Sequence, residues 1–298
     1  MDDLSSGEGW PAPAKLNLML HITGRRADGY HLLQTVFQLL DYGDTLRFKV
    51  TEGGRIRRCS VLPEVAETDD LTIRAASLLQ RHGGIHHGVD IYLTKRLPLG
   101  GGLGGGSSDA ATTLVALNQL WGCGLSISEL ASLGLRLGAD VPVFIHGHSA
   151  WAEGIGERLQ AIELPQRWYL VLKPAIEVST ASVFSTTELT RNCLPITISD
   201  FFSGRGTNVF EPVVRARYPA VAQALDWLSR HCAGHSDGAK LTGTGSCIFA
   251  SFRSRSVAES LLTELGEEWQ GFVASGMNIS PLLRRLRAEK SIHGNQLN

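Results

Sequence analysis

The sequence predicts a protein of mixed α/β class with two domains. Its 298 residues, 43% of them hydrophobic, are enough to bury two sizeable cores. Predicted strands, in which apolar and polar residues alternate, are interspersed along the chain with segments of helical periodicity. There is no internal repeat, and a new apolar strand is predicted near residue 168. We therefore expect a first domain over residues 1–162 and a second over residues 163–290.

The composition indicates in which cellular compartment the protein acts and which classes of partner it lacks. A net charge of −1 argues against nucleic acid as the main partner, because duplex-binding proteins usually carry a basic excess. The acidic start over residues 1–7 lacks the apolar core of a signal peptide, and no apolar run has membrane-spanning length. The five cysteines include no Cys-x-x-Cys pair and are predicted to be reduced thiols. We expect a cytoplasmic protein without a membrane partner.

The first predicted element is a strand over residues 13–22. Its apolar residues alternate with polar ones, so that Lys15 and Asn17 are neighbours on one face. For an isolated strand, a solvated polar face is the more common arrangement. The pair is nevertheless suited to binding, because a lysine can meet an anion and an amide can orient a hydroxyl group.

A turn over residues 24–29 follows, with Tyr30 and His31 at the mouth of the loop. Recognition residues are common at such positions, although on their own these two are as often structural as functional.

The next elements complete the stretch before the first glycine-rich loop. An amphipathic segment over residues 32–40 is followed by a predicted turn over residues 41–44 and then by a further strand over residues 46–50. Helical periodicity over residues 70–81 ends at two glycines.

Residues 98–111 are the most informative stretch of the chain. A predicted strand precedes six glycines, an apolar helix follows them, and Ser107 or Ser108 is expected to cap that helix. This order forms an anion site, since the free amide groups and the helix dipole converge over the loop. We expect a nucleotide polyphosphate there. The predicted binding residues are Pro98, Leu99, Gly100, Gly101, Gly102, Leu103, Gly104, Gly105, Gly106, Ser107 and Ser108.

Other glycine-rich loops fit less well. A Walker loop is excluded because no lysine follows the glycines. The dinucleotide pattern is matched formally, but about ninety residues precede the loop and no strand ending in an acidic residue follows its helix. A flexible linker would not carry Leu103 among its glycines and lead directly into an apolar helix.

The remaining chain contains one more candidate for chemistry. Ser126 and Glu129 form a capping box for the next helix. Asp140 then lies between apolar residues. It either caps a short helix or is a poorly solvated carboxylate that acts as a base or ligand.

The second half continues the α/β pattern. A strand is predicted over residues 168–174, followed by a short helix that carries Phe184 and is capped by Ser179 or Thr180. Another helix is predicted over residues 219–232, and a second glycine turn lies within residues 241–249. No histidine grouping has metal-ligand company in sequence, so no structural metal site is expected.

Taken together, the motifs over residues 13–18, 98–111 and 242–249 resemble the three motifs of the GHMP small-molecule kinases, in order and at appropriate separation. The segments over residues 14–18, 26–31, 138–142 and 278–281 make the chain most similar to those members that phosphorylate 4-diphosphocytidyl-2-C-methyl-D-erythritol, a step in isoprenoid biosynthesis. The resemblance covers nearly the whole chain.

The resemblance implies an N-terminal domain like the second domain of ribosomal protein S5 and a ferredoxin-like C-terminal domain. ATP would lay its phosphates on the glycine loop, and Lys95 would contact the adenine nucleotide. Mg²⁺ would arrive mainly on those phosphates, with Ser107 as a ligand. For the assembly we expect a monomer or a weak homodimer.

The resemblance also assigns roles at the acceptor. Asp140 would take the proton of the 2-hydroxyl group and Lys15 would be its electrostatic partner, while Asn17 would help to orient the acceptor. The cytosine would be held by Tyr30, His31 and Phe184. The chain departs from the family at Asp70, where relatives often have an asparagine near the adenine pocket.

Two alternatives remain open from the sequence. One is another GHMP kinase that acts on homoserine or a mevalonate-type alcohol, for which a nucleobase clamp would be wasted. The other is a nucleotide- or RNA-binding module that uses the same fold without catalysis.

Overall fold

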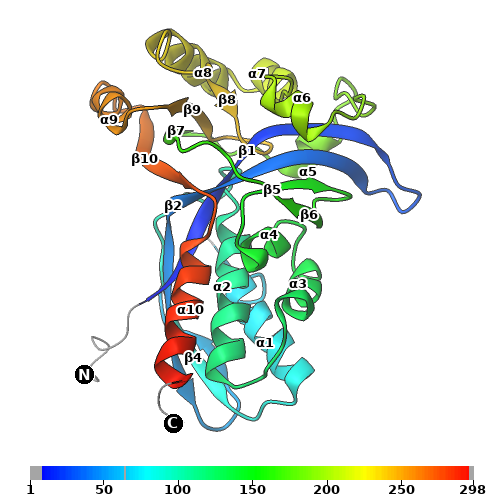
Figure 1. Cartoon of the computed structure of the whole chain (residues 1–298), viewed down its shortest axis with the longest axis vertical. Helices are drawn as coiled ribbons and strands as arrows, with labels where there is room; N and C mark the ends of the chain where they lie inside the picture. Colours follow the sequence, from blue (N-terminus) through cyan, green and yellow to red (C-terminus); the bar gives the residue numbers. More distant parts are fainter. Residues whose placement is uncertain (1–8, 64, 295–298) are drawn as a thin grey trace.

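The structure, a computed structural model, describes residues 9–63 and 65–294. Within that part of the chain it shows two units joined by two long strands that run through both (Figure 1). The strands are β1 (Trp10–Arg25), β2 (His31–Thr51), β3 (Ile56–Arg58), β4 (Gly88–Thr94), β5 (Ala150–Glu153), β6 (Arg158–Ala161), β7 (Trp168–Pro174), β8 (Lys240–Leu241), β9 (Ile248–Phe252) and β10 (Trp269–Met277). The helices are α1 (Leu71–Gly83), α2 (Gly105–Leu120), α3 (Ile127–Leu135), α4 (Val141–His146), α5 (Thr180–Phe184), α6 (Ile198–Phe202), α7 (Glu211–Arg217), α8 (Pro219–His231), α9 (Arg255–Thr263) and α10 (Pro281–Gly294).

The strand β2 is the centre of the sheet. It pairs with β1 along one edge and with β4, β5 and β10 along the other. The turn predicted over residues 41–44 is wrong, because β2 continues through it. A Cβ atom at Gly43 would lie 2.1 Å from the carbonyl oxygen of Ala12, so the glycine serves a close approach of β1 and β2.

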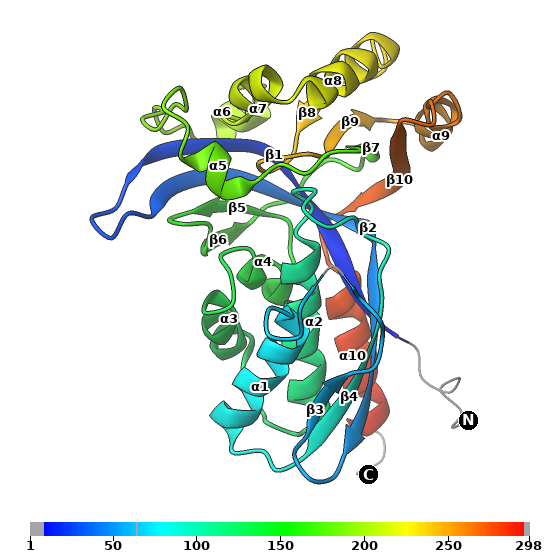
Figure 2. The same cartoon turned by 180° about the vertical axis from the view of Figure 1, so that it is seen from behind.

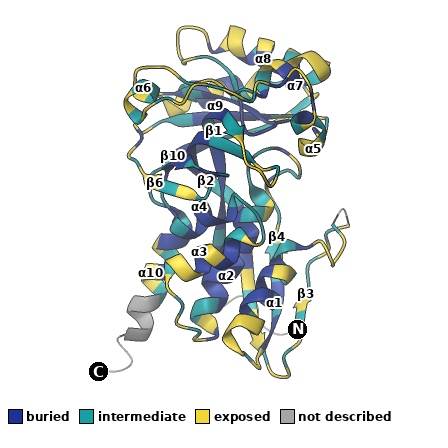
Figure 3. Ribbon diagram, turned by 90° about the vertical axis from the view of Figure 1, so that its right-hand side faces the viewer, coloured by how far each residue is buried: buried dark blue, intermediate teal, exposed yellow. Residues whose placement is uncertain are grey.

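In the lower unit, α1 and α2 pack together, and α2 lies against β1 and β2 (Figures 1 and 2). Most residues of α2 are buried, and the helix forms the middle of the first core (Figure 3). The predicted helix over residues 70–81 is confirmed and begins at its cap Asp70. The capping box of Ser126 and Glu129 is confirmed as well.

The upper unit is built around β7 to β10. These strands lie in the order β10-β7-β9-β8, which is the order 4-1-3-2 of a ferredoxin-like βαββαβ unit. The helices α8 and α9 pack on its strands, and the apolar face between them forms a second core. The predicted cap Ser179 is confirmed, since its hydroxyl oxygen accepts a hydrogen bond from the amide of Ser182 in the first turn of α5.

The last helix returns to the first unit. Leu282, Leu283 and Leu286 of α10 belong to the first core, although α10 follows the ferredoxin-like unit in the chain. Residues 281–289 of the predicted second domain therefore pack on the first one. The division at residue 162 stays a prediction.

The structure bears on the expectations about membrane-spanning segments and cysteines. No helix within the described ranges is both long and apolar enough to span a bilayer. All five cysteines are free, and Cys232 and Cys247 are buried. Residues 1–7, on which the expected lack of a signal peptide rests, lie outside the described residues.

The placement of α10 leads to a prediction about stability. Leu282→Ala should lower the free energy of unfolding by about 3 kcal/mol, because it empties a fully buried position in the first core. Arg284→Ala, at an exposed position of the same helix, should change it by less than about 0.5 kcal/mol. Urea denaturation measures both values. Equal effects of the two variants would mean that α10 does not contribute to the core.

Candidate active site

A pocket of about 830 Å³ lies where the two units meet. Its walls come from β1, β2, the loop before α2, the start of α4 and the segments around α5 and residue 243. Nearly all the predicted site residues line it: Lys15, Asn17, Tyr30, His31, Lys95, Asp140, Phe184 and residues 98–107. Ser108 does not line the pocket and is fully buried in α2.

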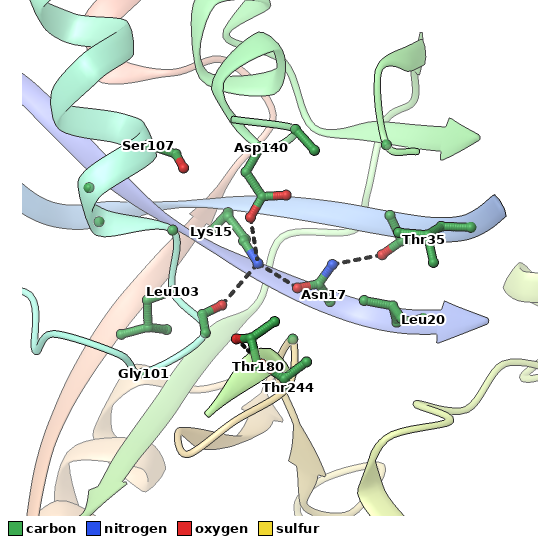
Figure 4. Close-up of a pocket in the computed structure, with 18 of the residues that line it drawn as sticks. Lys15, Asn17, Leu20, Thr35, Gly101, Leu103, Ser107, Asp140, Thr180 and Thr244 are labelled. Atoms are coloured by element: carbon green, nitrogen blue, oxygen red, sulfur yellow. Dashed lines mark hydrogen bonds and ion pairs between the residues drawn. The ribbon is translucent and has the colours of Figure 1, made fainter. Parts of the chain in front are cut away.

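The strand β1 places Lys15 and Asn17 side by side in the pocket (Figure 4). Their spacing of two residues puts both on one face, as predicted. That face is not solvated, however, since Lys15 is 3% and Asn17 2% exposed. The half-exposed strand is therefore wrong, because the glycine loop and the turn at residue 242 cover the polar face.

The ammonium group of Lys15 has three partners. It donates to Oδ1 of Asn17 at 2.6 Å and to the carbonyl oxygen of Gly102 at 2.9 Å. Oδ2 of Asp140 lies 3.4 Å away (Figure 4). Because an ammonium group has three protons, each of them has a partner. The contact with Asp140 is the longest of the three, so the proton directed at Asp140 is the one that Lys15 can most easily share with an oxygen atom of a bound ligand.

The glycine loop adopts a backbone that other residues would strain. Gly100, Gly102 and Gly104 all have φ between +63° and +77°. A Cβ atom at Gly102 would lie 2.3 Å from the carbonyl oxygen of Thr242, so the two glycine-rich turns touch through this residue.

The helix α2 begins without a side-chain cap. Its N-cap is Gly104, and no side chain accepts a hydrogen bond from the first turn. The prediction that Ser107 or Ser108 caps the helix is wrong, since both lie inside it. The free amide groups of the first turn and the helix dipole therefore remain available to an anion over the loop.

Asp140 occupies the N-cap position of α4, but its side chain makes no capping hydrogen bond. It pairs with Lys15 instead. The expected poor solvation is wrong, because the carboxylate is 36% exposed while the neighbouring Val141 and Phe144 are buried in the first core. The structure therefore leaves the carboxylate open to the pocket, where a substrate can reach it.

The aromatic residues gather at the other end of the pocket. The rings of His31 and Phe184 lie 5.0 Å apart, and Phe184 meets Phe210 edge-on at 4.8 Å. Tyr30 lines the mouth and is 61% exposed. Burial lowers the pKa of His31, and the charges of Arg191 and Arg25 lower it further. A neutral imidazole beside an aromatic ring suits a planar, polar ligand.

Lys95 lies beneath the glycine loop with its charge already shared. Its ammonium group contacts Asp44 at 2.5 Å and Asp109 at 2.8 Å. Burial raises the pKa of Asp109 to about 7, and the charge of Asp44 adds to this while that of Lys95 opposes it. Burial alone would lower the pKa of Lys95, but the two carboxylates raise it.

Asp70, the departure from the family pattern, has a structural position. Its Oδ1 accepts from the amide and the hydroxyl group of Thr72, which caps α1. Its Oδ2 pairs with Arg58 at 2.8 Å, so the carboxylate charge is compensated. The neighbouring Leu71, and not Asp70, lines the pocket.

Four threonines of the site did not emerge as site residues from the sequence. Thr35, Thr180 and Thr244 line the pocket, and Thr242 accepts from the backbone amide of Asn17. The predicted glycine turn over residues 241–249 contains two of them and could have indicated them. Thr35 has no such signal, because it lies in the middle of a strand.

Comparisons with known proteins show which family the chain belongs to. The profile of the GHMP kinase N-terminal domain matches residues 70–148, and that of the C-terminal domain matches residues 197–271. The 4-diphosphocytidyl-2-C-methyl-D-erythritol kinase of Nitrosococcus oceani is 60% identical over 92% of this chain and 96% of its own. The chain belongs to this family of GHMP kinases. It is therefore an enzyme, an ATP-dependent kinase.

Other relatives agree with this family. The 4-diphosphocytidyl-2-C-methyl-D-erythritol kinase of Alkalilimnicola ehrlichii is 59% identical over 94% of this chain and 95% of its own. A crystal structure of 4-(cytidine 5'-diphospho)-2C-methyl-D-erythritol kinase superposes with a TM-score of 0.78 at 30% identity, covering 90% of this chain and 99% of that one. A mevalonate kinase structure, at 17% identity and a TM-score of 0.64, covers 91% of this chain and all of its own and shares the fold. The predicted family and fold class are confirmed.

The buried group of Asp44, Lys95 and Asp109 predicts a pH dependence of stability. Between about pH 4 and pH 7 the folded protein keeps a proton on Asp109 that the unfolded chain has lost. The wild type should therefore lose stability relative to Asp109→Asn as the pH rises through this window, by about 4 kcal/mol in total. Urea denaturation at several pH values measures the difference.

A surface carboxylate is the matched control for this measurement. The hydrogen bond from Arg57 lowers the pKa of Asp90, so the difference in stability between wild type and Asp90→Asn should stay constant above about pH 4 and shrink only below it. A difference between wild type and Asp109→Asn that stays constant from pH 4 to pH 8 would contradict the raised pKa.

Proposed function

We propose that this kinase transfers the γ-phosphoryl group of ATP to the 2-hydroxyl group of 4-diphosphocytidyl-2-C-methyl-D-erythritol, giving the 2-phosphate and ADP in isoprenoid precursor biosynthesis. The observation that carries the proposal is the single pocket in which a glycine loop, a lysine–aspartate pair and an aromatic cluster face one another. The relatives of 60% and 59% identity that bear this substrate in their names support the assignment.

The proposed chemistry follows from the positions of Asp140 and Lys15. Asp140 accepts the proton of the acceptor hydroxyl group while the oxygen of that hydroxyl group attacks the γ-phosphorus of ATP. The bond between the γ-phosphorus and the bridging oxygen of the β-phosphate breaks, which releases ADP. Lys15, 3.4 Å from Asp140, offers positive charge to the carboxylate and to the oxygens of the transferred group. Asn17 contacts Lys15 and lines the same pocket, where it would help to orient the acceptor.

The nucleotide is proposed to lie over the glycine loop. The uncapped amide groups at the start of α2 would bind the phosphates, and residues 98–107 would enclose them. Lys95 would add a donor near Gly105, since a Cβ atom at that glycine would lie 3.2 Å from its Nζ.

The expected Mg²⁺ fits a site of this composition. No group of three or more histidine, cysteine, aspartate or glutamate residues within 9–63 and 65–294 could hold a metal ion by itself. The hydroxyl group of Ser107 lines the pocket, so a metal that arrives on the phosphates would find one protein oxygen there. Mg²⁺ would neutralise charge on the phosphate oxygens.

The cytosine is proposed to lie among the aromatic residues at the far end of the pocket. His31 and Phe184 offer a ring face and a neutral imidazole, and Tyr30 closes the mouth. The test of the substrate is ATP consumption with the cytidine compound compared with homoserine, galactose and phosphomevalonate. Turnover with one of the other alcohols alone would replace the proposed substrate and keep the kinase.

A substitution of Asp140 tests its proposed role as the general base. Asp140→Asn should lower kcat by about 10²- to 10⁴-fold and leave ATP binding within about twofold, because the amide cannot take the proton. The lost charge is 36% exposed, so the fold should persist. Single-turnover kinetics and nucleotide titration measure the two effects. A kcat close to that of the wild type would remove Asp140 from the mechanism.

A substitution of Phe184 tests the proposed cytosine site. Phe184→Ala should raise KM for the cytidine substrate about tenfold and leave KM for ATP unchanged, since it removes a ring face from one end of the pocket only. Phe202→Ala, an exposed phenylalanine outside the pocket lining, is the control and should change neither constant. A parallel rise in both constants for Phe184→Ala would indicate a folding defect.

A further inference from the structure

Thr35 is a buried polar residue of β2 that neither the motifs nor the proposed chemistry uses. It is 1% exposed and lines the pocket together with Phe37, two positions along the same strand. It pairs with Leu20 across the ladder between β1 and β2. Its hydroxyl group lies within hydrogen-bond distance of the side chain of Asn17 on the wall of the pocket.

The hydrogen bonds of Thr35 have only one consistent direction. Its hydroxyl group donates to the carbonyl oxygen of Met19 at 2.6 Å. It also lies 2.8 Å from Nδ2 of Asn17 (Figure 4). Because a hydroxyl group has a single proton, which the carbonyl takes, its oxygen can only accept from Asn17. The amide of Asn17 must therefore turn its nitrogen toward Thr35.

This orientation of the amide determines what Lys15 meets. With Nδ2 toward Thr35, Oδ1 faces the ammonium group at 2.6 Å, the shortest of its three contacts. An amide turned the other way would present an N–H group to a cation. Thr35 thus holds Asn17 in the one orientation that gives Lys15 an acceptor.

A local irregularity of β1 makes this contact available. The register between β1 and β2 shifts between Asn17 and Met19. The carbonyl oxygen of Met19 bonds the Thr35 side chain, and a buried carbonyl group needs such a partner. Bulges next to active sites commonly redirect side chains in this way.

We propose that Thr35 is a positioning residue for phosphoryl transfer, which fixes the amide of Asn17 and through it the ammonium group of Lys15 near Asp140. The proposal rests on the proposed function, since it assumes that Lys15 and Asp140 act in catalysis. Its expected effect is on the alignment of the charged groups and not on substrate binding, because the hydroxyl group of Thr35 is already engaged by Asn17 and Met19.

The test compares Thr35→Val with Thr35→Ser. Thr35→Val keeps the shape and removes both hydrogen bonds, so kcat should fall about tenfold while KM for ATP and for the cytidine substrate stay within about twofold. Thr35→Ser keeps the hydroxyl group and should retain kcat within about threefold. A Val variant with wild-type kcat, or a Ser variant that falls as far as Val, would overturn the proposal.

A double mutant separates positioning from simple loss of packing. In the background of Asn17→Ala, Thr35→Val should cause no further loss of kcat, because the group that it orients is gone. A further tenfold loss in that background would overturn the proposal. If Thr35→Val does not unfold cooperatively in thermal denaturation, Thr35→Ala replaces it with the same expectation.

The side-chain amide of Asn17 provides a readout that does not depend on activity. Its ¹⁵N–¹H resonances should shift in Thr35→Val and remain in place in Thr35→Ser. Unchanged resonances in Thr35→Val would contradict the positioning role whatever the kinetics show. A wild-type protein that does not turn over the cytidine substrate would instead refute the proposed function, so the two failures are distinguishable.

Discussion

The buried ammonium group of Lys15 is the constraint on which the site depends. A cation that is 3% exposed loses its hydration, and this cost is offset only when every proton has a partner. The partners come from three places in the chain: Asn17 on β1, the carbonyl group of Gly102 in the glycine loop, and Asp140 at the start of α4. Satisfying one charge therefore brings the proposed base and the phosphate loop together.

A second lysine, the partly buried Lys95, lies beside the glycine loop. Lys95 faces two carboxylates, Asp44 and Asp109, so the group beneath the loop carries no spare positive charge when both are ionised. Attraction of a polyphosphate must then come from the uncapped start of α2 and from Lys15. Asp44 also accepts from the amides of Arg96 and Leu97, which fixes the chain just before the glycines. This group therefore helps to hold the loop in place, and Lys95, with two carboxylate partners for its three protons, can still offer the proposed nucleotide a hydrogen-bond donor.

Local sequence predicted those features that depend on local chemistry. The helix over residues 70–81 and the box of Ser126 and Glu129 follow from caps and periodicity, and both are present. Apart from the cap of α2, which lies at Gly104 and not at Ser107 or Ser108, the predictions that are wrong concern features that depend on distant residues. Gly43 looked like a turn because its role, a close approach to Ala12, lies across the sheet. The solvation of Asp140 does not follow from its sequence neighbours, because Val141 and Phe144 are buried in the core while the carboxylate of Asp140 faces the pocket. Thr35 became visible only through the partners that the fold provides.

Near the aromatic end of the pocket, Arg191 has two effects, one on the helix α5 and one on the pKa of His31. The guanidinium group of Arg191 donates to the carbonyl oxygen of Phe184, the last residue of α5, and to those of Thr186 and Leu189 in the segment that follows. The same charge lowers the pKa of His31, in addition to the effect of burial. Arg191 therefore fixes the helix that carries Phe184 and disfavours a charge on the imidazole beside it. A neutral imidazole can both donate and accept a hydrogen bond, whereas an imidazolium can only donate. The proposed cytosine presents donors and acceptors along one edge, so a neutral His31 is the form that can match it.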